Sequence, residues 1–259
     1  MSADRNQLHA ILTPLFLAWT ILVHAQEPEG WSADFSFERA SVTIDGDDQV
    51  WGSERVQFHY RDLDQGGVFF GGARITRFGE ADAAFVAGGY RRLGDWTVLG
   101  QVGVSPNADF YYRQSVEAEV SRRAVGTLVA HLKYRYLNFP LAKVQIVAPG
   151  ATYYLAKGEL HGRIFFVNNQ ALDIDSQSVL VRGQWWLSQR FRISGGVAVG
   201  ERIFDITSLP GVPADGWVVY GETLVRIHER GGLGVTIGFA HEEPFFDRRN
   251  FGVYYRRWF

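Results

Sequence analysis

The sequence contains no cysteine, and its single methionine is the initiator Met1. Without cysteine the chain forms no disulfide, although exported proteins often carry them, and it offers no thiolate to a metal. After residue 26 there is no run of 18 apolar residues, which excludes a membrane-spanning helix from that region. A basic run is also missing, so the sequence gives no indication of a nucleic-acid partner.

The first 25 residues have the order of a secretory signal peptide. A polar start with Arg5 precedes the apolar run Ile11–Val23, and the small-residue site ends at Ala25. This run of 13 residues is short for a bilayer span, so cleavage between Ala25 and Gln26 is favoured over a retained anchor helix. We therefore predict a cleaved signal peptide over 1–25 and a single domain over 26–259.

Alternation of apolar and polar residues, which is typical of β-strands, recurs along the rest of the chain. In FYYRQSVEAEVS, residues 110–121, the even positions are mostly apolar, whereas the odd positions carry Arg113, Glu117 and Glu119. TLVAHLKYRYL, residues 127–137, repeats this pattern. The pattern predicts about fourteen strands at 31–44, 49–60, 67–78, 82–91, 96–104, 109–121, 126–136, 144–154, 159–168, 177–187, 191–204, 216–228, 233–241 and 250–259.

Short and long connections alternate between these segments. Links such as RLGD, AKGE and ERGG are short, whereas LNFPLAK, DITSLPGVPAD and HEEPFFDRR are longer. A meander with short turns at one end and long loops at the other is typical of outer-membrane barrels, whose termini are periplasmic. A soluble β-sandwich or lipocalin-like barrel is the alternative.

The polar faces of the segments favour the membrane barrel. Fourteen strands with their apolar faces inward would enclose more space than those side chains fill, and an unpaired charge in a dry core costs several kcal/mol. With the apolar faces toward lipid, the charged faces line a wet interior. We therefore predict an all-β fold: a closed antiparallel up-and-down transmembrane β-barrel of about 14 strands with periplasmic termini, in the outer membrane of a Gram-negative bacterium.

This orientation predicts a set of residues that face the lumen. The charged members are Arg113, Glu117, Glu119, Lys133, Arg135, Arg163, Arg182, Arg192, Glu222, Arg226 and Arg256. The aromatic members are Tyr111, Tyr153, Tyr220 and Tyr254.

The whole region after residue 25 resembles the YaiO family of outer-membrane β-barrel proteins. The stretch LKYRYLNFPLAKVQIVAPGATYYL, residues 132–155, carries most of the likeness, and the closing WF after a tyrosine-rich strand is also similar. The resemblance implies an outer-membrane barrel with a link to surface or exported polysaccharide, and it supplies no catalytic residue. By a wider resemblance, a terminal signal read by the barrel-assembly machinery is formed by Phe251, Val253, Tyr255 and Phe259, whereas Arg257 departs from that pattern.

Catalytic and metal-binding patterns are weak throughout. The sequence has no Gly-x-Ser-x-Gly and no Asp-rich calcium loop, and DGDD at 45–48 is better explained as a turn. Glu117 and Glu119 are adjacent on one strand face, roughly 7 Å apart along the backbone, whereas a glycosidase pair normally flanks its substrate from two strands. We predict no catalytic residue, no cofactor and no metal. An outer-membrane lipid- or glycan-modifying enzyme whose activity depends on Glu117 or His131 is the third hypothesis for function.

The leading hypothesis is a pore or translocation barrel. Basic residues outnumber acidic ones in the predicted lumen, which favours anionic oligosaccharides or an exported polysaccharide as the passenger. The second hypothesis is a non-conducting structural or assembly barrel that binds a partner through its outer loops, with the lumen residues forming a salt-bridged plug. Expected partners in all cases are outer-membrane lipid and the barrel-assembly machinery.

Overall fold

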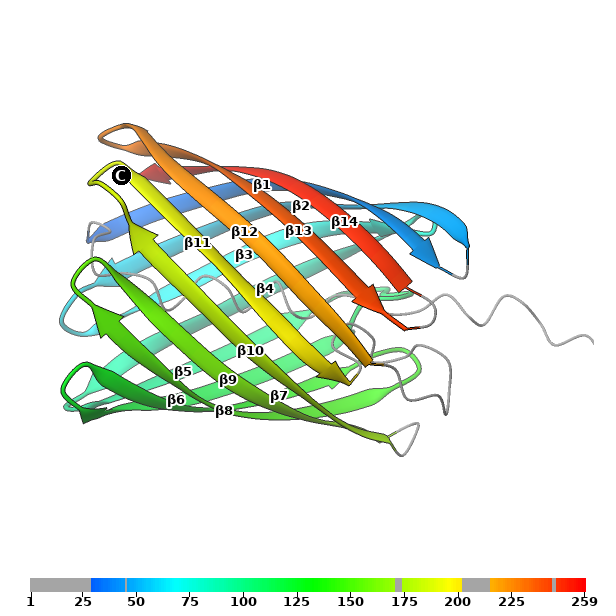
Figure 1. The fold of residues 1–259 in the computed structure, drawn as a ribbon, viewed down its shortest axis with the longest axis horizontal. Coiled ribbons are helices and arrows are strands. Elements are labelled where there is room, and N and C mark those ends of the chain that lie inside the picture. Colours follow the sequence, from blue (N-terminus) through cyan, green and yellow to red (C-terminus); the bar gives the residue numbers. More distant parts are fainter. Residues whose placement is uncertain (1–28, 45, 171–173, 202–214, 244–245) are drawn as a thin grey trace, which may run out of the picture.

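The computed structural model is a closed barrel of fourteen antiparallel strands and describes residues 29–44, 46–170, 174–201, 215–243 and 246–259. Each strand pairs with its neighbours in sequence, and the last pairs with the first (Figure 1). The predicted barrel is confirmed, whereas the predicted signal peptide, with Ala25 and Gln26, lies outside the described residues. The strands are β1 (Gly30–Ile44), β2 (Asp47–Asp62), β3 (Gly66–Arg77), β4 (Glu80–Leu93), β5 (Trp96–Val104), β6 (Gln114–Val125), β7 (Leu128–Asn138), β8 (Lys143–Leu155), β9 (Gly158–Asn169), β10 (Ile174–Trp186), β11 (Phe191–Glu201), β12 (Asp215–His228), β13 (Gly231–Glu242) and β14 (Phe246–Trp258).

The apolar faces of the strands point outward and the polar faces inward. On β6, Val116 is 48% exposed whereas the next residue, Glu117, is 3% exposed. On β7, Leu132 is 50% exposed and Lys133 only 6%. This is the reverse of a soluble protein, and it follows from a bilayer solvating the outside of the barrel.

The two ends of the barrel differ. Residues 94–95, 126–127 and 156–157 are tight turns at the end that also holds the start of β1 and the end of β14 (left in Figure 1). Gly94 and Gly126 have φ of 63° and 57°, a left-handed conformation that favours glycine in such turns. We call this the turn end and the opposite end the loop end. Bacterial barrels place short turns in the periplasm, so the loop end faces outward.

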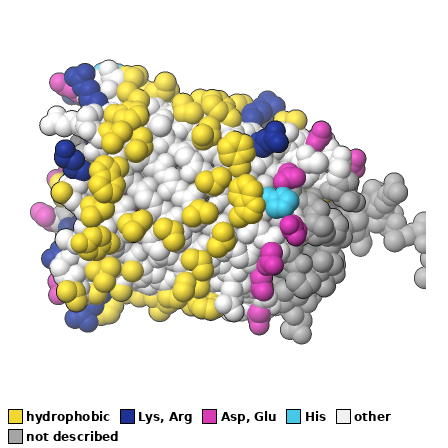
Figure 2. Space-filling view, viewed as in Figure 1, with side chains coloured by type: hydrophobic (Ala, Val, Ile, Leu, Met, Phe, Trp, Pro, Cys, Tyr) yellow, Lys and Arg dark blue, Asp and Glu magenta, His cyan; other side chains and the backbone are white. Residues whose placement is uncertain are grey.

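Exposed apolar side chains on all fourteen strands form a band on the outer wall, and Figure 2 shows one face of it. Trp31, Tyr60, Trp96 and Trp185 are 37–44% exposed near the turn end and form an aromatic girdle at that edge. On such a band an arginine costs about 2–4 kcal/mol at the bilayer midplane and close to nothing near the headgroups. Among the described residues, no helix is long and apolar enough to cross a membrane.

One strand boundary differs from the sequence prediction in an informative way. The segment expected at 109–121 begins its strand only at Gln114, because residues 105–113 form a connection with buried side chains. The segment expected at 191–204 is a strand to Glu201, and its remaining residues lie outside the described part of the chain.

Candidate functional site in the barrel interior

A buried network of ion pairs connects β6, β7 and β9 inside the barrel. Lys133 Nζ lies 2.6 Å from Glu117 Oε1 and 3.5 Å from Glu119 Oε2. Arg135 is the register partner of Glu117, and Arg163 on β9 donates a hydrogen bond of 3.1 Å to Glu119. These five side chains are each at most 7% exposed. They therefore fill this part of the interior instead of lining open water.

A chain of polar contacts extends this network to β8. His131 Nδ1 lies 3.2 Å from Glu119 Oε1, and His131 Nε2 lies 2.9 Å from the hydroxyl of Thr152. That hydroxyl is also 2.8 Å from Nδ1 of His161. An acid, a histidine and a hydroxyl in series are the parts of a hydrolase triad. Thr152, however, is 0% exposed, so its hydroxyl lies away from solvent, where it joins the histidines of β7 and β9.

A second group of ion pairs lies where the first and last strands meet. Arg256 on β14 donates from Nε and from its second terminal nitrogen to the two carboxylate oxygens of Asp34 on β1, both over 2.6 Å. Nearby, Arg192 on β11 lies 2.5 Å from Glu222 on β12, and the Tyr254 hydroxyl donates to Glu222 over 2.7 Å. The pairs thus tie together four strands around the seam.

This second group borders a cavity of about 150 Å³ in the middle of the barrel. Its lining comes from one continuous arc of the barrel wall, which runs from β9 through β14 to β1 and β2. The charged residues in its lining are four arginines and four acids: Arg55, Arg182, Arg192, Arg256, Asp34, Glu38, Glu159 and Glu222. The formal charges of these groups cancel.

The connection 105–113 narrows the loop end of the barrel. The Asp82 carboxylate accepts hydrogen bonds from the backbone N–H groups of Asp109, Phe110 and Tyr111 at 3.1, 3.1 and 2.8 Å. The Ser105 hydroxyl donates to the carbonyl of Ala83. Phe110, Tyr111 and Tyr112 are at most 2% exposed and belong to an apolar cluster with inward residues of β3, β4, β7 and β8. We call residues 105–113 the inward loop.

Burial fixes the charge state of one tyrosine in this loop. Desolvation and the neighbouring Tyr112 hydroxyl raise the pKa of Tyr111 far above its ordinary value. The ring is therefore neutral and acts as an apolar filler.

A second apolar cluster lies on another part of the inner wall at the loop end. It contains Trp51 with small side chains of β1, β11, β12 and β13. The Arg77 guanidinium lies 4.7 Å from the Trp51 ring centroid and 5.6 Å from that of Phe110, in cation–π geometry with both. Arg77, itself 2% exposed, thus connects the second cluster with the inward loop.

The structure places most of the predicted lumen residues inside the barrel. The charged ones with buried or half-buried side chains are Glu117, Glu119, Lys133, Arg135, Arg163, Arg182, Arg192, Glu222, Arg226 and Arg256, and the aromatic ones are Tyr220 and Tyr254. Arg226 is near the turn end, where its guanidinium lies 5.1 Å from the ring centroids of both Trp186 and Trp258.

Three of the predicted positions need correction. Arg113 is exposed and precedes β6, because the inward loop ends there and the strand phase does not extend back to it. Tyr153 is 49% exposed on the outer wall, and Tyr154 takes the inward position, because β8 alternates in phase with the fully buried Thr152. Tyr111 is buried in the inward loop, where the apolar cluster covers the face that was expected to meet a passenger.

Sequence reasoning missed several acidic residues of the interior. Asp34, Glu38 and Glu159 line the cavity, and Asp82 holds the inward loop. Their inward phase in β1, β4 and β9 was the available signal. Among the described residues, no group of three or more His, Asp or Glu side chains is placed to hold a metal ion.

Comparison with known proteins agrees with this architecture. A family model for the YaiO membrane beta barrel domain matches residues 36–185. By sequence, no curated protein matches the chain.

Solved outer-membrane barrels share the fold at very low identity. The CymD monoaromatic hydrocarbon channel is 6% identical with a TM-score of 0.58, covering 90% of each chain. Omp33 of Acinetobacter baumannii is 10% identical with a TM-score of 0.54, and the match covers 90% of this chain and 100% of that one. OmpT of Vibrio cholerae is 10% identical with a TM-score of 0.52, covering 92% of this chain and 100% of that one.

Proposed function

Because this chain belongs to the YaiO family of membrane β-barrel proteins, and is an outer-membrane barrel of a Gram-negative bacterium, we propose that it is a narrow channel for small polar solutes. The observation that carries the proposal is the charge-balanced cavity of about 150 Å³ inside the barrel. A cavity of this size accommodates one molecule about as large as benzene.

The lining of the cavity supports small solutes that carry both charges. Opposite charges alternate around it, as with Arg192 beside Glu222 and Arg256 beside Asp34. A zwitterion can exchange its hydration for contacts with both signs, whereas an ion of one sign meets repulsion as well as attraction. The anion preference expected from the basic residues of the sequence therefore has no support at this cavity.

Two other passengers fit less well. An exported polysaccharide, which the family resemblance suggested, would need a lumen wider than this cavity and a displaced inward loop. CymD is described as a channel for monoaromatic hydrocarbons, but such solutes would desolvate the buried charges of this interior without satisfying them.

The second candidate function is a non-conducting structural barrel. The observation in its favour is the dense pairing of Lys133, Glu117, Glu119 and Arg163, which fills the interior along β6 to β9. In this alternative the ion pairs are a permanent plug, and the outer loops hold a partner.

Conductance and solute uptake separate these functions. We expect the purified protein to give small single-channel currents in planar bilayers with weak ion selectivity. Proteoliposomes should swell in a zwitterion of glycine size and not in a trisaccharide. Heat-modifiable gel migration provides the control for folding. Silence of the folded protein in both assays would favour the structural barrel, and strong anion selectivity would contradict the charge-balanced cavity.

A further inference from the structure

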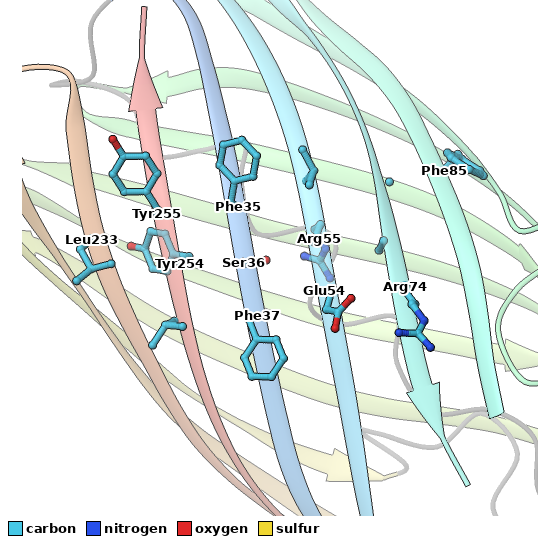
Figure 3. A pocket seen from close by; sticks show the side chains of 14 residues that line it. Phe35, Ser36, Phe37, Glu54, Arg55, Arg74, Phe85, Leu233, Tyr254 and Tyr255 are labelled. Carbon is cyan, nitrogen blue, oxygen red and sulfur yellow. The ribbon is translucent and has the colours of Figure 1, made fainter. Parts of the chain in front are cut away.

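Charged side chains interrupt the apolar outer wall on β1, β2, β3 and β14. Arg39, Glu54, Arg74 and Arg249 are all exposed and alternate in phase with inward neighbours. Glu54 on β2 and Arg74 on β3 are register partners (Figure 3). Arg249 is two residues from the register partner of Arg39, so these two arginines are diagonal neighbours, about 7–8 Å apart.

A groove of about 610 Å³ lies beside these charges on the outer wall. It forms because the outward position between Val56 and Phe85 in the register is Gly72, which has no side chain. Phe35 and Phe37 of β1 add apolar walls, and Glu54 and Arg74 belong to the same lining (Figure 3). The groove is thus apolar along most of its length and charged at one part.

The charges lie in the outer half of the membrane. Glu54 is six residues along β2 from Tyr60 of the turn-end girdle, which is about 20 Å along a strand and about 15 Å in depth at the usual strand tilt. The apolar band of such barrels is about 25 Å tall, so Glu54 and its register partner Arg74 lie just beyond the midplane, and an arginine that extends along the wall shortens the remaining distance to the outer headgroups. When the strands are aligned by their register partners, Arg39 and Arg249 lie nearer the loop end than Arg74 does.

We propose that this groove is a binding site for a phosphorylated lipid of the outer leaflet. The apolar part, Phe35, Phe37, Val56 and Phe85 around Gly72, holds an acyl chain. Arg39, Arg74 and Arg249 pair with the phosphate-bearing headgroup. The three arginines outnumber Glu54 and Asp247, the outward residue of β14 two positions before Arg249, so the charged part is net cationic, which complements a phosphate and disfavours a zwitterionic headgroup. The lipid is favoured over a protein occupant because this wall faces the bilayer.

Titration with phosphorylated lipid A tests the site. The protein is reconstituted in phosphatidylcholine nanodiscs with increasing lipid A, and native mass spectrometry counts the lipid A retained per barrel. We expect Arg74→Gln to weaken retention at least tenfold and Glu54→Gln to strengthen it, because the second variant removes the negative charge beside Arg74. Gly72→Leu should weaken retention by filling the groove, and its Cβ fits, since the nearest atoms are 3.5 Å away.

The matched control is Arg91→Gln, which removes an exposed arginine at the turn end of β4 and should leave retention unchanged. Parallel shifts for Glu54→Gln and Arg74→Gln would contradict the proposal, because they would indicate a pair that only stabilises the wall. The proposal would also be overturned if dephosphorylated lipid A were retained as well as phosphorylated lipid A. The same holds if inorganic phosphate displaced lipid A as effectively as added phosphorylated lipid A does. If a charge variant does not fold, Gly72→Leu alone still tests the proposal, because unchanged lipid A retention by this variant would show that the groove does not bind the lipid.

Discussion

Replacing Asp82 by alanine is expected to raise the single-channel conductance several-fold. The variant removes the acceptor for three backbone N–H groups of the inward loop, at Asp109, Phe110 and Tyr111. Each buried donor left unsatisfied costs about 1–3 kcal/mol, so the loop gains by leaving the interior for water. Planar-bilayer recording of the folded variant measures the effect.

The matched control for this experiment is Asp109→Ala in the same loop, whose side chain is exposed. It removes the same charge without removing the anchor, and its conductance should equal that of the parent. If Asp82→Ala and the parent conduct alike, the inward loop does not limit passage. If both are silent, the ion pairs deeper in the barrel close it, as the structural-barrel alternative requires.

Replacing Arg256 by methionine is expected to lower the free energy of unfolding by about 3–5 kcal/mol, because the half-buried Asp34 carboxylate loses both of its short hydrogen bonds and keeps the more distant His59 Nε2 at 3.6 Å. The two residues are register partners across the seam between β14 and β1, and their side chains are 10% and 12% exposed. Urea unfolding in lipid vesicles, followed by tryptophan fluorescence, measures the change.

Arg257→Met is the control at the seam, because Arg257 is exposed on the outer wall next in sequence. It should change the free energy of unfolding by less than about 1 kcal/mol. The double variant Asp34→Leu/Arg256→Met should recover most of the loss, since replacing both partners of a buried pair is often neutral. A double variant as unstable as Arg256→Met alone would show that the loss is not due to an orphaned charge.

The barrel could be predicted from the sequence because its main signal is local. Leu132 faces outward and Lys133 inward, and this difference can be predicted from two neighbouring residues of opposite polarity. The same alternation is expected on every strand, because lipid surrounds the outer face. The number of strands and their meander order followed from counting such segments and their connections.

The details of the interior depended on contacts far apart in sequence. The alternation in FYYR, residues 110–113, predicts the start of a strand. In the structure the backbone N–H groups of Phe110 and Tyr111 donate instead to the Asp82 carboxylate on β4, so a tertiary contact overrides the local pattern. At Tyr153 and Tyr154, two identical letters left the phase undetermined until the burial of Thr152 fixed it. The irregular FERASVTI, residues 37–44, hid the inward phase of Glu38, and with it part of the acidic lining.

The side-chain and carbonyl anchors on β4 hold one part of the inward loop, and the backbone N–H of Arg113 also donates to the carbonyl of Asn138 on β7. Asp82 and Ala83 lie on β4, and Ser105 begins the loop itself. The hydrogen-bonded ladder that closes the barrel, by contrast, is finished between β14 and β1, far away in sequence. The constriction by the inward loop and the closure of the barrel therefore depend on different parts of the chain, although Asp34 and Arg256 at the seam also line the cavity. Under the proposed channel function, substitutions within residues 82–113 change the opening at the loop end while the ladder between β14 and β1 stays unchanged.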